Sequence, residues 1–278
     1  MTQAPHRGRV LVLAGSDSGG GAGIQADIKT ITALGGYAAT AITAVTVQNT
    51  LGVTAVHPIP LDIVEAQARA VLDDIGADAF KTGMLGDAAT VEVVTRVLDS
   101  AKGIPAVIDP VMVAKGGASL LAQPAVGALK SLLLPRAALL TPNAPEAAAL
   151  TGLTVETTDD LRRAGEALLE LGAHAVLMKG GHILEGNGLG ERVVDLLITR
   201  QGETAFEGER IDTRHTHGTG CTLASACAVG LAQGLTVTES VARAWNYVHQ
   251  AMLRAPGFGA GHGPLDHGWP IRGEGERK

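Results

Sequence analysis

Aromatic residues, cysteines and blocks of like charge are all scarce in this chain of 278 residues. Aromatic side chains make up 3% and hydrophobic residues 46% of the sequence, so a buried core would consist mainly of Ala, Val, Leu and Ile. The net charge of −6, without any run of one sign, argues against nucleic acid or an anionic membrane as the main partner. We therefore expect a globular protein whose partners are small molecules.

The two cysteines, Cys221 and Cys227, form neither a disulfide framework nor a zinc pattern. On one helix they would be rotated by roughly 240° and could not face each other. The polar N-terminal tail lacks the apolar region of a signal peptide, and no apolar stretch reaches the roughly 18 uninterrupted residues of a membrane span. These absences favour the reducing cytoplasm as the location of the protein.

Strand and helix patterns alternate along the chain. This alternation predicts an α/β fold of three layers, α/β/α, with a mainly parallel central sheet covered on both faces. One domain should span residues 9–263, with tails at 1–8 and 264–278. The short apolar runs that indicate the buried strands are 9–14, 79–82, 105–109, 137–140 and 174–178.

Polar and glycine-rich segments follow the ends of several of these strands. Ligands of open α/β sheets bind beyond the carboxyl ends of the strands, where such segments meet at one edge. We therefore predict a single site at this edge. The segments expected to converge there are Gly15-Ser16-Asp17, Thr82-Gly83-Met84, Asp109-Pro110-Val111, Asn143, Lys179-Gly180 and the loop from His217 to Cys221.

A loop that feeds a buried helix is indicated by the segment Thr216-His217-Gly218-Thr219-Gly220-Cys221-Thr222. Such a helix start would present free backbone N–H groups and the positive end of a dipole, which suits a phosphate or a developing anion. Cys221 would lie at its mouth, where the pKa of a thiol is expected to be lowered. The alternative is an ordinary loop before a core helix, with Cys221 as a small hydrophobic residue.

Two carboxylates and an amide are expected around one point of the same edge. Asp109 ends a buried strand, and Asn143 and Glu146 are one helical turn apart at a predicted helix start. Hydrated Mg²⁺ takes few protein ligands and suits such a set. Lys179, at another strand end, could reach a phosphate. The alternatives are a first-turn helix acid for Glu146 and a surface lysine for Lys179.

The glycine-rich stretch 15–23 lacks the Gly-Lys-Ser/Thr ending of a P-loop and the order of a dinucleotide fingerprint. Its glycines still permit a close approach of the backbone to a ligand. Asp27, one turn into the following helix, is either a ligand contact or a solvated first-turn acid. Four histidines have no spacing that fits a tetrahedral metal site, and we interpret them as packed or solvated side chains. These are His174, His182, His215 and His217.

Seven ordered motifs together resemble the hydroxymethylpyrimidine/phosphomethylpyrimidine kinases, which belong to the ribokinase-like superfamily. The resemblance spans about residues 9–255, without large gaps, and implies a ribokinase-like fold. The motifs are Ala14-Gly15-Ser16-Asp17 with Gly20-Gly21-Ala22-Gly23-Ile24-Gln25-Ala26-Asp27, Val47-Gln48-Asn49-Thr50, Lys81-Thr82-Gly83-Met84-Leu85, Asp109-Pro110-Val111-Met112, Thr141-Pro142-Asn143-Ala144-Pro145-Glu146-Ala147, Met178-Lys179-Gly180-Gly181-His182 and Thr216-His217-Gly218-Thr219-Gly220-Cys221-Thr222-Leu223.

The resemblance implies two steps of thiamine biosynthesis that depend on ATP and Mg²⁺. The first phosphorylates 4-amino-5-hydroxymethyl-2-methylpyrimidine on its hydroxymethyl oxygen, and the second converts the monophosphate to the diphosphate. Gln48 would pair with the aminopyrimidine edge, because an amide offers both a donor and an acceptor. The other implied roles are a pocket lined by Gly15, Asp27, Met84 and Val111, Mg²⁺ held through water by Asp109 and Glu146, ATP phosphates faced by Asn143 and Lys179, and an anion hole formed by Gly218, Thr219 and Gly220.

Cys221 stands where most of the wider superfamily has an aspartate base. The loose transition state of phosphoryl transfer demands little of a base. The acceptor of the second step is already an anionic phosphate and needs none. We therefore expect Cys221 to matter mainly in the first step.

Other functions share many of these residues. Pyridoxal and pyridoxine kinases have nearly every motif, although the amide of Gln48 suits the amino edge of a pyrimidine better. A sugar kinase is disfavoured by Cys221 in place of the aspartate. A non-catalytic pyrimidine-sensing module is opposed by the intact Asp109, Glu146 and Lys179. We also expect a homodimer, and an extended glycine-rich loop over residues 185–190.

Overall fold

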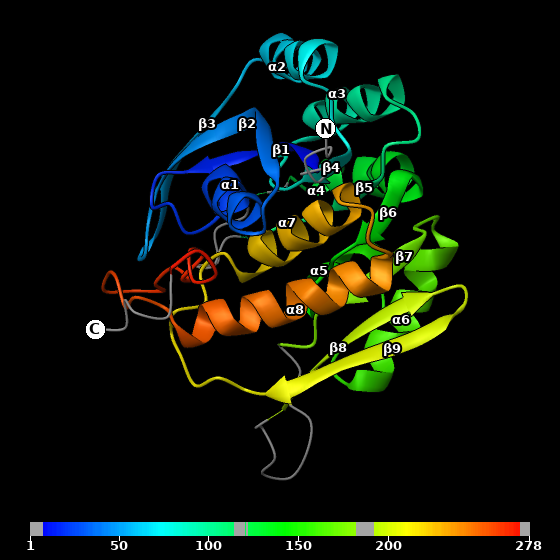
Figure 1. The fold of residues 1–278 in the computed structure, drawn as a ribbon. Helices are drawn as coiled ribbons and strands as arrows, with labels where there is room; N and C mark the ends of the chain where they lie inside the picture. The colour runs from blue at the N-terminus through cyan, green and yellow to red at the C-terminus, as the bar shows by residue number, and fades with distance from the viewer. Residues whose placement is uncertain (1–7, 114–119, 121, 182–191, 273–278) are drawn as a thin grey trace, which may run out of the picture.

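The computed structural model describes residues 8–113, 120, 122–181 and 192–272. One sheet runs through the molecule in the order β3-β2-β1-β4-β5-β6-β7-β8-β9 (Figure 1). The strands from β2 to β7 in this order are parallel, and β3, β8 and β9 are antiparallel to their neighbours. The predicted mainly parallel sheet is therefore confirmed. The strands are β1 (Arg9–Asp17), β2 (Tyr37–Asn49), β3 (Gly52–Pro58), β4 (Ala79–Thr82), β5 (Ala106–Ile108), β6 (Ala137–Leu140), β7 (Ala175–Met178), β8 (Arg192–Thr199) and β9 (Gly202–Glu209).

Helices cover both faces of this sheet, which confirms the α/β/α layers (Figure 1). Alternate residues of β1 point to opposite faces, as strand geometry requires. Leu11 and Leu13 pack into the core shared with α2 to α6, and Val10 and Val12 into the core shared with α1, α7 and α8. The helices are α1 (Gly23–Ala33), α2 (Leu61–Asp74), α3 (Ala88–Ser100), α4 (Gln123–Ala128), α5 (Ala144–Thr151), α6 (Thr158–Glu170), α7 (Thr219–Ala232) and α8 (Val237–Leu253).

The sequence pattern of residues 123–133 predicts a helix, and the structure is helical there, although not as one regular α-helix. Helix α4 ends at Ala128 and continues as a π-helical turn, Leu129–Leu133, and a 3₁₀ turn, Leu134–Arg136. Pro135 has no backbone N–H and its ring clashes with the preceding turn, so a regular helix cannot continue through it. The widened turn delivers the chain into β6.

The last described residues, 264–272, pack against helices α7 and α8. His267 Nε2 lies 3.0 Å from Thr222 Oγ1, and the hydroxyl of Tyr247 donates to the carbonyl oxygen of His267 at 2.6 Å. Leu265 is buried beside them. Part of the segment after residue 263, which the sequence suggests is a tail, therefore contributes contacts to the body of the domain.

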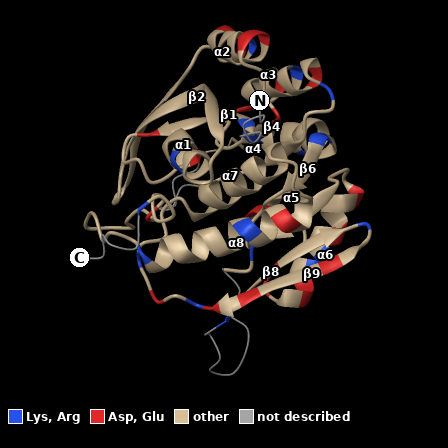
Figure 2. Ribbon diagram, in the orientation of Figure 1, with Lys and Arg blue, Asp and Glu red and all other residues tan. Residues whose placement is uncertain are grey.

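Charged side chains of both signs lie on the outer helices, whereas those of β9 are all acidic (Figure 2). No helix in the described part of the chain is both long and apolar enough to cross a bilayer.

Candidate active site

A cavity of about 1360 Å³ lies at the carboxyl ends of the parallel strands. The predicted convergence of strand-end segments is therefore present in the structure. Every residue that the sequence predicts for the site lines this cavity except Asp27. The predicted residues on its wall are Gly15, Gln48, Met84, Asp109, Val111, Asn143, Glu146, Lys179, Gly218, Thr219, Gly220 and Cys221.

Helix α7 begins at the wall of this cavity. Gly218 precedes it with φ +84°, a left-handed conformation that favours glycine, and a Cβ there would lie 1.8 Å from the carbonyl oxygen of Gly21. The loop after β1 and the loop before α7 are therefore pressed together, backbone to backbone. Since the first N–H groups of a helix lack intrahelical acceptors, this start is able to receive an anion.

An ammonium group and two carboxylates meet beside that helix start. Lys179 Nζ lies 3.2 Å from Asp109 Oδ1 and 3.8 Å from Glu146 Oε2. A Cβ on Gly220 would lie 3.3 Å from Lys179 Nζ, so the backbone of α7 approaches the same point. Thr141 Oγ1 also donates to Asp109 Oδ1 at 3.2 Å. The side chains come from the ends of β5, β6 and β7 and the starts of α5 and α7.

Burial governs the electrostatics of this cluster. Burial raises the pKa of Glu146, and Lys179 only partly offsets it, while the nearby Asp109 adds to it. Burial would lower the pKa of Lys179, but Asp109 and Glu146 hold that pKa above its ordinary range. Lys179 is therefore a fixed cation at neutral pH, which suits it to a phosphate.

The helix-cap interpretation of Glu146 is also correct. Asn143 Oδ1 accepts from the N–H of Glu146 at 2.9 Å, and Glu146 Oε2 accepts from the N–H of Asn143 at 2.8 Å, which is a capping box. The cap fixes both side chains at the cavity wall. Among the described residues no group of three or more His, Cys, Asp or Glu side chains forms a metal site. Asp109 and Glu146 are two carboxylates, which fits only an ion that keeps most of its water, as Mg²⁺ does.

Cys221 corrects one prediction. A helix start was expected to lower the pKa of its thiol, but burial raises that pKa to about 11. Lys81 and the N–H of Gly23 favour the thiolate, whereas the charges of Asp27 and Asp109 oppose it. Cys221 lines the cavity as a neutral thiol at neutral pH.

Asp27 lies beneath the cavity and not on its wall. Its carboxylate is completely buried and accepts hydrogen bonds from Lys81 Nζ at 2.9 Å and from Ser225 Oγ at 2.6 Å. A direct contact of Asp27 with a ligand, which the sequence suggests, does not fit this burial. Lys81, which pairs with Asp27, is itself one of the residues that line the cavity.

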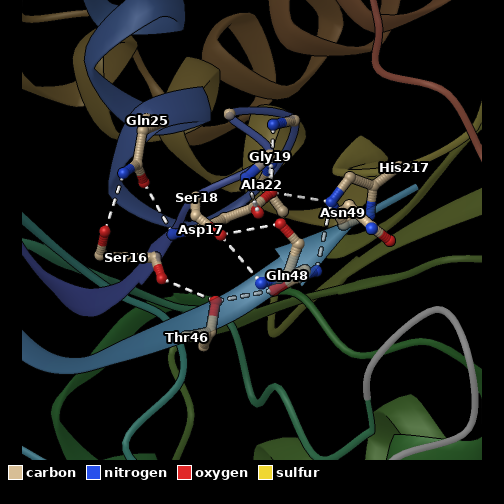
Figure 3. A network of polar contacts seen from close by, with 12 residues as sticks. Ser16, Asp17, Ser18, Gly19, Ala22, Gln25, Thr46, Gln48, Asn49 and His217 are labelled. Carbon is tan, nitrogen blue, oxygen red and sulfur yellow. Dashed lines mark hydrogen bonds and ion pairs between the residues drawn. The ribbon is translucent and has the colours of Figure 1, made fainter. Parts of the chain in front are cut away.

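A second group of lining residues includes Gly15, Gln48, Met84 and His217. Gly15 lies against Met84, since a Cβ there would be 2.5 Å from Met84 Cε. Gln48, on β2, directs its amide toward His217, with 3.3 Å between Gln48 Nε2 and His217 Nε2 (Figure 3). Asp17 Oδ2 lies 2.8 Å from the same ring nitrogen. Val111, which follows β5, also lines the cavity.

Sequence reasoning gave no role to four residues of this site, although the segments that hold Asp17 and His217 were expected at this edge. His217 was interpreted as a packed or solvated side chain, and Asp17, Lys81 and Asp195 were given no role. Asp195, on β8, accepts from the N–H of Gly180 at 2.7 Å and so holds the turn that carries Lys179. The position of His217 directly before Gly218 was the one available signal. His182 and the predicted loop 185–190 lie outside the described residues.

Sequence comparisons agree with this geometry. The model of the phosphomethylpyrimidine kinase family matches residues 17–266. The hydroxymethylpyrimidine/phosphomethylpyrimidine kinase of Streptomyces coelicolor is 50% identical over 262 residues, covering 94% of this chain and 95% of that protein. The thiamine biosynthesis bifunctional protein ThiED of Geobacter sulfurreducens is 48% identical over 261 residues. That match covers 94% of this chain but only 52% of ThiED, so the chain spans about half of that relative.

A structural comparison gives the same fold with a different substrate. The pyridoxal kinase of Staphylococcus aureus in complex with pyridoxal superposes with a TM-score of 0.86 and 34% identity. The match covers 94% of this chain and 93% of that kinase. The fold is therefore shared by kinases that act on different rings, and the ring must be selected by particular side chains.

Proposed function

The chain belongs to the phosphomethylpyrimidine kinase family, and from that premise we propose that it makes a pyrimidine diphosphate in two ATP-dependent steps. The first step phosphorylates the hydroxymethyl oxygen of 4-amino-5-hydroxymethyl-2-methylpyrimidine, and the second phosphorylates the resulting monophosphate. The product serves thiamine biosynthesis, as the name of the related ThiED indicates for that protein. The observation that carries the proposal is the presence of Lys179, its two carboxylates and the start of α7 in the same cavity as Gln48.

Positioning and charge stabilisation supply most of the catalysis in such a reaction. The hydroxymethyl oxygen forms a bond to the γ-phosphorus as the bond to the β,γ-bridging oxygen breaks and ADP departs. Lys179 and the N–H groups at Gly218, Thr219 and Gly220 would balance the negative charge on the transferred group. Asn143, fixed by its capping box, would lie beside the phosphates of ATP.

Asp109 and Glu146 would hold Mg²⁺ through water. The donor set fits, because two carboxylates lie close together around a cationic group and leave room for water ligands. When bound, Mg²⁺ supplies charge neutralisation at the phosphates. Lys179 remains a cation beside both carboxylates and contributes to the same balance.

Cys221 would orient the hydroxymethyl group of the substrate. Its thiol is neutral at neutral pH because burial raises its pKa to about 11. A neutral thiol orients an alcohol better than it deprotonates one. We therefore assign Cys221 a role in the first step and none in the second, where the acceptor oxygen is already anionic.

The Gln48 amide supports the pyrimidine over pyridoxal as the ring, since it lies at the cavity wall with a donor and an acceptor to offer. Pyridoxal phosphorylation is the second candidate, supported by the fold shared with the pyridoxal kinase. The intact Asp109, Glu146 and Lys179 cluster speaks against a sensing module that binds the ring without consuming ATP. The free thiols of Cys221 and Cys227 suit the cytoplasm, and we retain a homodimer as the expected assembly.

The purified chain should consume ATP with the aminopyrimidine and release the monophosphate and then the diphosphate. Product identification by mass spectrometry would follow both steps in one sample. Pyridoxal should be the poorer acceptor in the same assay. A higher kcat/KM for pyridoxal than for the aminopyrimidine would overturn the choice of ring, and binding of the pyrimidine without ATP turnover would favour the sensing module.

A further inference from the structure

The buried side chains of Asp17 and His217 connect the loop after β1 to the loop before α7, and both line the cavity with Gln48. Asp17 Oδ2 lies 2.8 Å from His217 Nε2, and Asp17 also accepts from the N–H groups of Gly19, Gly21 and Ala22 (Figure 3). Burial alone would raise the pKa of Asp17, but the hydrogen bonds from His217 and the backbone hold it below its ordinary range. Asp17 is therefore ionised and can only accept.

The ionised carboxylate of Asp17 determines which nitrogen of the His217 ring carries a hydrogen. Because the carboxylate of Asp17 carries no hydrogen, His217 Nε2 must carry one. The amide of Gln48 lies 3.3 Å from the same nitrogen. A side-chain amide has a donor end and an acceptor end of nearly equal shape, so the neighbouring hydrogens decide which end faces His217.

The hydrogens of the neighbouring groups favour one orientation of the Gln48 amide. With the NH₂ group toward His217, two donors would face each other. The single hydrogen of Thr46 Oγ1 would then be shared between Ser16 O at 2.9 Å and Gln48 Oε1 at 3.1 Å. With the amide turned over, its oxygen shares the hydrogen of His217 Nε2 with Asp17 Oδ2, and its NH₂ donates to Thr46 Oγ1. The Thr46 hydroxyl is then free to donate to Ser16 O.

Two hydrogen bonds tie the backbone of Gln48 to Ser18. The N–H of Gln48 donates to Ser18 Oγ at 2.8 Å, and Ser18 Oγ is also 2.8 Å from the carbonyl oxygen of Gln48. The choice is therefore made by rotation of the side chain alone.

We propose that Asp17 and His217 are positioning residues that hold the Gln48 amide with its oxygen toward His217, and thereby select rings with an amino group beside the hydroxymethyl group. This inference rests on the proposed function. The amino and hydroxymethyl groups are on neighbouring ring carbons. His217 directly precedes Gly218, so an amino group bound on the His217 side of Gln48 turns the hydroxymethyl group toward the start of α7.

A ring with the reverse pattern meets the wrong end of the amide. A 4-oxo pyrimidine carries a carbonyl in place of the amine and an N–H at the neighbouring ring nitrogen. Its carbonyl would face the oxygen of Gln48, and its N–H would face the NH₂ group. The held amide therefore rejects this ring, whereas an amide free to turn over would accept it.

The test compares kcat/KM of the first phosphorylation for the 4-amino ring and its 4-oxo counterpart. In His217→Leu the donor is lost, and the preference for the amino ring should fall by about tenfold or more. His217→Gln carries an N–H at a similar reach and should restore much of the preference. Thr46→Val removes the hydroxyl on the other side of the amide and should also reduce it. Near-equal melting temperatures would show that the variants are folded.

The outcomes separate this inference from the proposed function. A wild-type chain that does not phosphorylate the aminopyrimidine would overturn the proposed function, and the inference with it. A wild-type chain that does so, with an unchanged ring preference in both His217→Leu and Thr46→Val, would overturn the inference alone. If His217→Leu does not fold, the preference of Thr46→Val decides. A merely structural role of His217 would lower activity toward both rings equally.

Discussion

Lys81 Nζ lies 2.9 Å from Asp27 Oδ1, and both side chains are completely buried. The partners come from β4 and α1, and Ser225 on α7 donates to the same carboxylate at 2.6 Å. Burial raises the pKa of Asp27 despite the opposing charge of Lys81. The pair and Ser225 therefore connect β4, α1 and α7. Burying each charge costs desolvation energy, and the opposite charge of its partner offsets part of that cost.

Removing one member of this pair should be strongly destabilising. Lys81→Met leaves the Asp27 carboxylate uncompensated in the core, and the free energy of unfolding should fall by about 3–5 kcal/mol. Urea denaturation followed by circular dichroism measures this. Arg69→Met, which breaks an exposed pair with Glu65, is the matched control and should cost at most about 1 kcal/mol. Equal costs for the two variants would contradict the prediction.

The sequence predicts the site edge because parallel strands end on one side of a sheet, so residues such as Asp109 and Lys179 must converge. It does not predict which side chains pair across the fold. The family resemblance implied that Asp27 lines the pocket, but its partner Lys81 lies on a strand distant in the sequence, which the pattern of the helix does not contain. Asp17 and His217 belong to opposite ends of the chain, and only packing of their loops brings them together.

The thiol of Cys221 also shows this limit. Its position at a helix start was predictable, and the expected lowering of its pKa was wrong because burial depends on the side chains packed around it. A local motif gives the dipole, but the three-dimensional neighbours Asp27 and Asp109 give the opposing charge. Electrostatics in a core is set by distant residues, which a local pattern does not contain.

Cys221→Ala should slow the first phosphorylation far more than the second. Because the neutral thiol orients the alcohol, the wild-type rate of the first step should not follow the fraction of thiolate as the pH approaches about 11. The variant loses this orienting contact, and its first-step rate should be lower by about 10²-fold. Single-turnover assays started from the alcohol or from the monophosphate separate the two steps. Equal losses in both steps would reject the assignment.

Asp195 should titrate near neutrality. Burial raises its pKa to about 6, despite the hydrogen bonds from Gly180 and Trp245 and the charge of Lys179. The folded state therefore binds a proton more tightly than the unfolded state, so this group adds stability as the pH falls through about 6. The gain reaches about 3 kcal/mol once the pH is below the unfolded pKa.

Fluorescence of Trp245 reports on this proton. The emission should change with a midpoint near pH 6 in the wild type, because the indole N–H is bonded to the carboxylate of Asp195. The transition should vanish in Asp195→Asn. Trp245→Phe, which leaves Trp269 as the emitter, should also lack it. A transition that persists in both variants would assign the proton to another group.

Glu146 allows the role in Mg²⁺ binding to be separated from the role in helix capping. Glu146→Gln retains an oxygen for the N–H of Asn143, so the capping box and the melting temperature should be preserved. The negative charge is lost, and the Mg²⁺ concentration needed for half-maximal activity should rise by about 10–100-fold, as for other groups that hold a metal through water.

Glu239 provides the matched control for that variant. It occupies the same capping position at the start of α8, bonded to Thr236, and is not on the cavity wall. Glu239→Gln should therefore leave both the melting temperature and the Mg²⁺ requirement unchanged. If Glu146→Gln behaves in the same way, Glu146 is only a helix cap, and the divalent ion must be held by other groups. If its Mg²⁺ requirement alone rises, the carboxylate has a second function that its capping geometry makes possible, because the cap holds it facing Asp109 and Lys179.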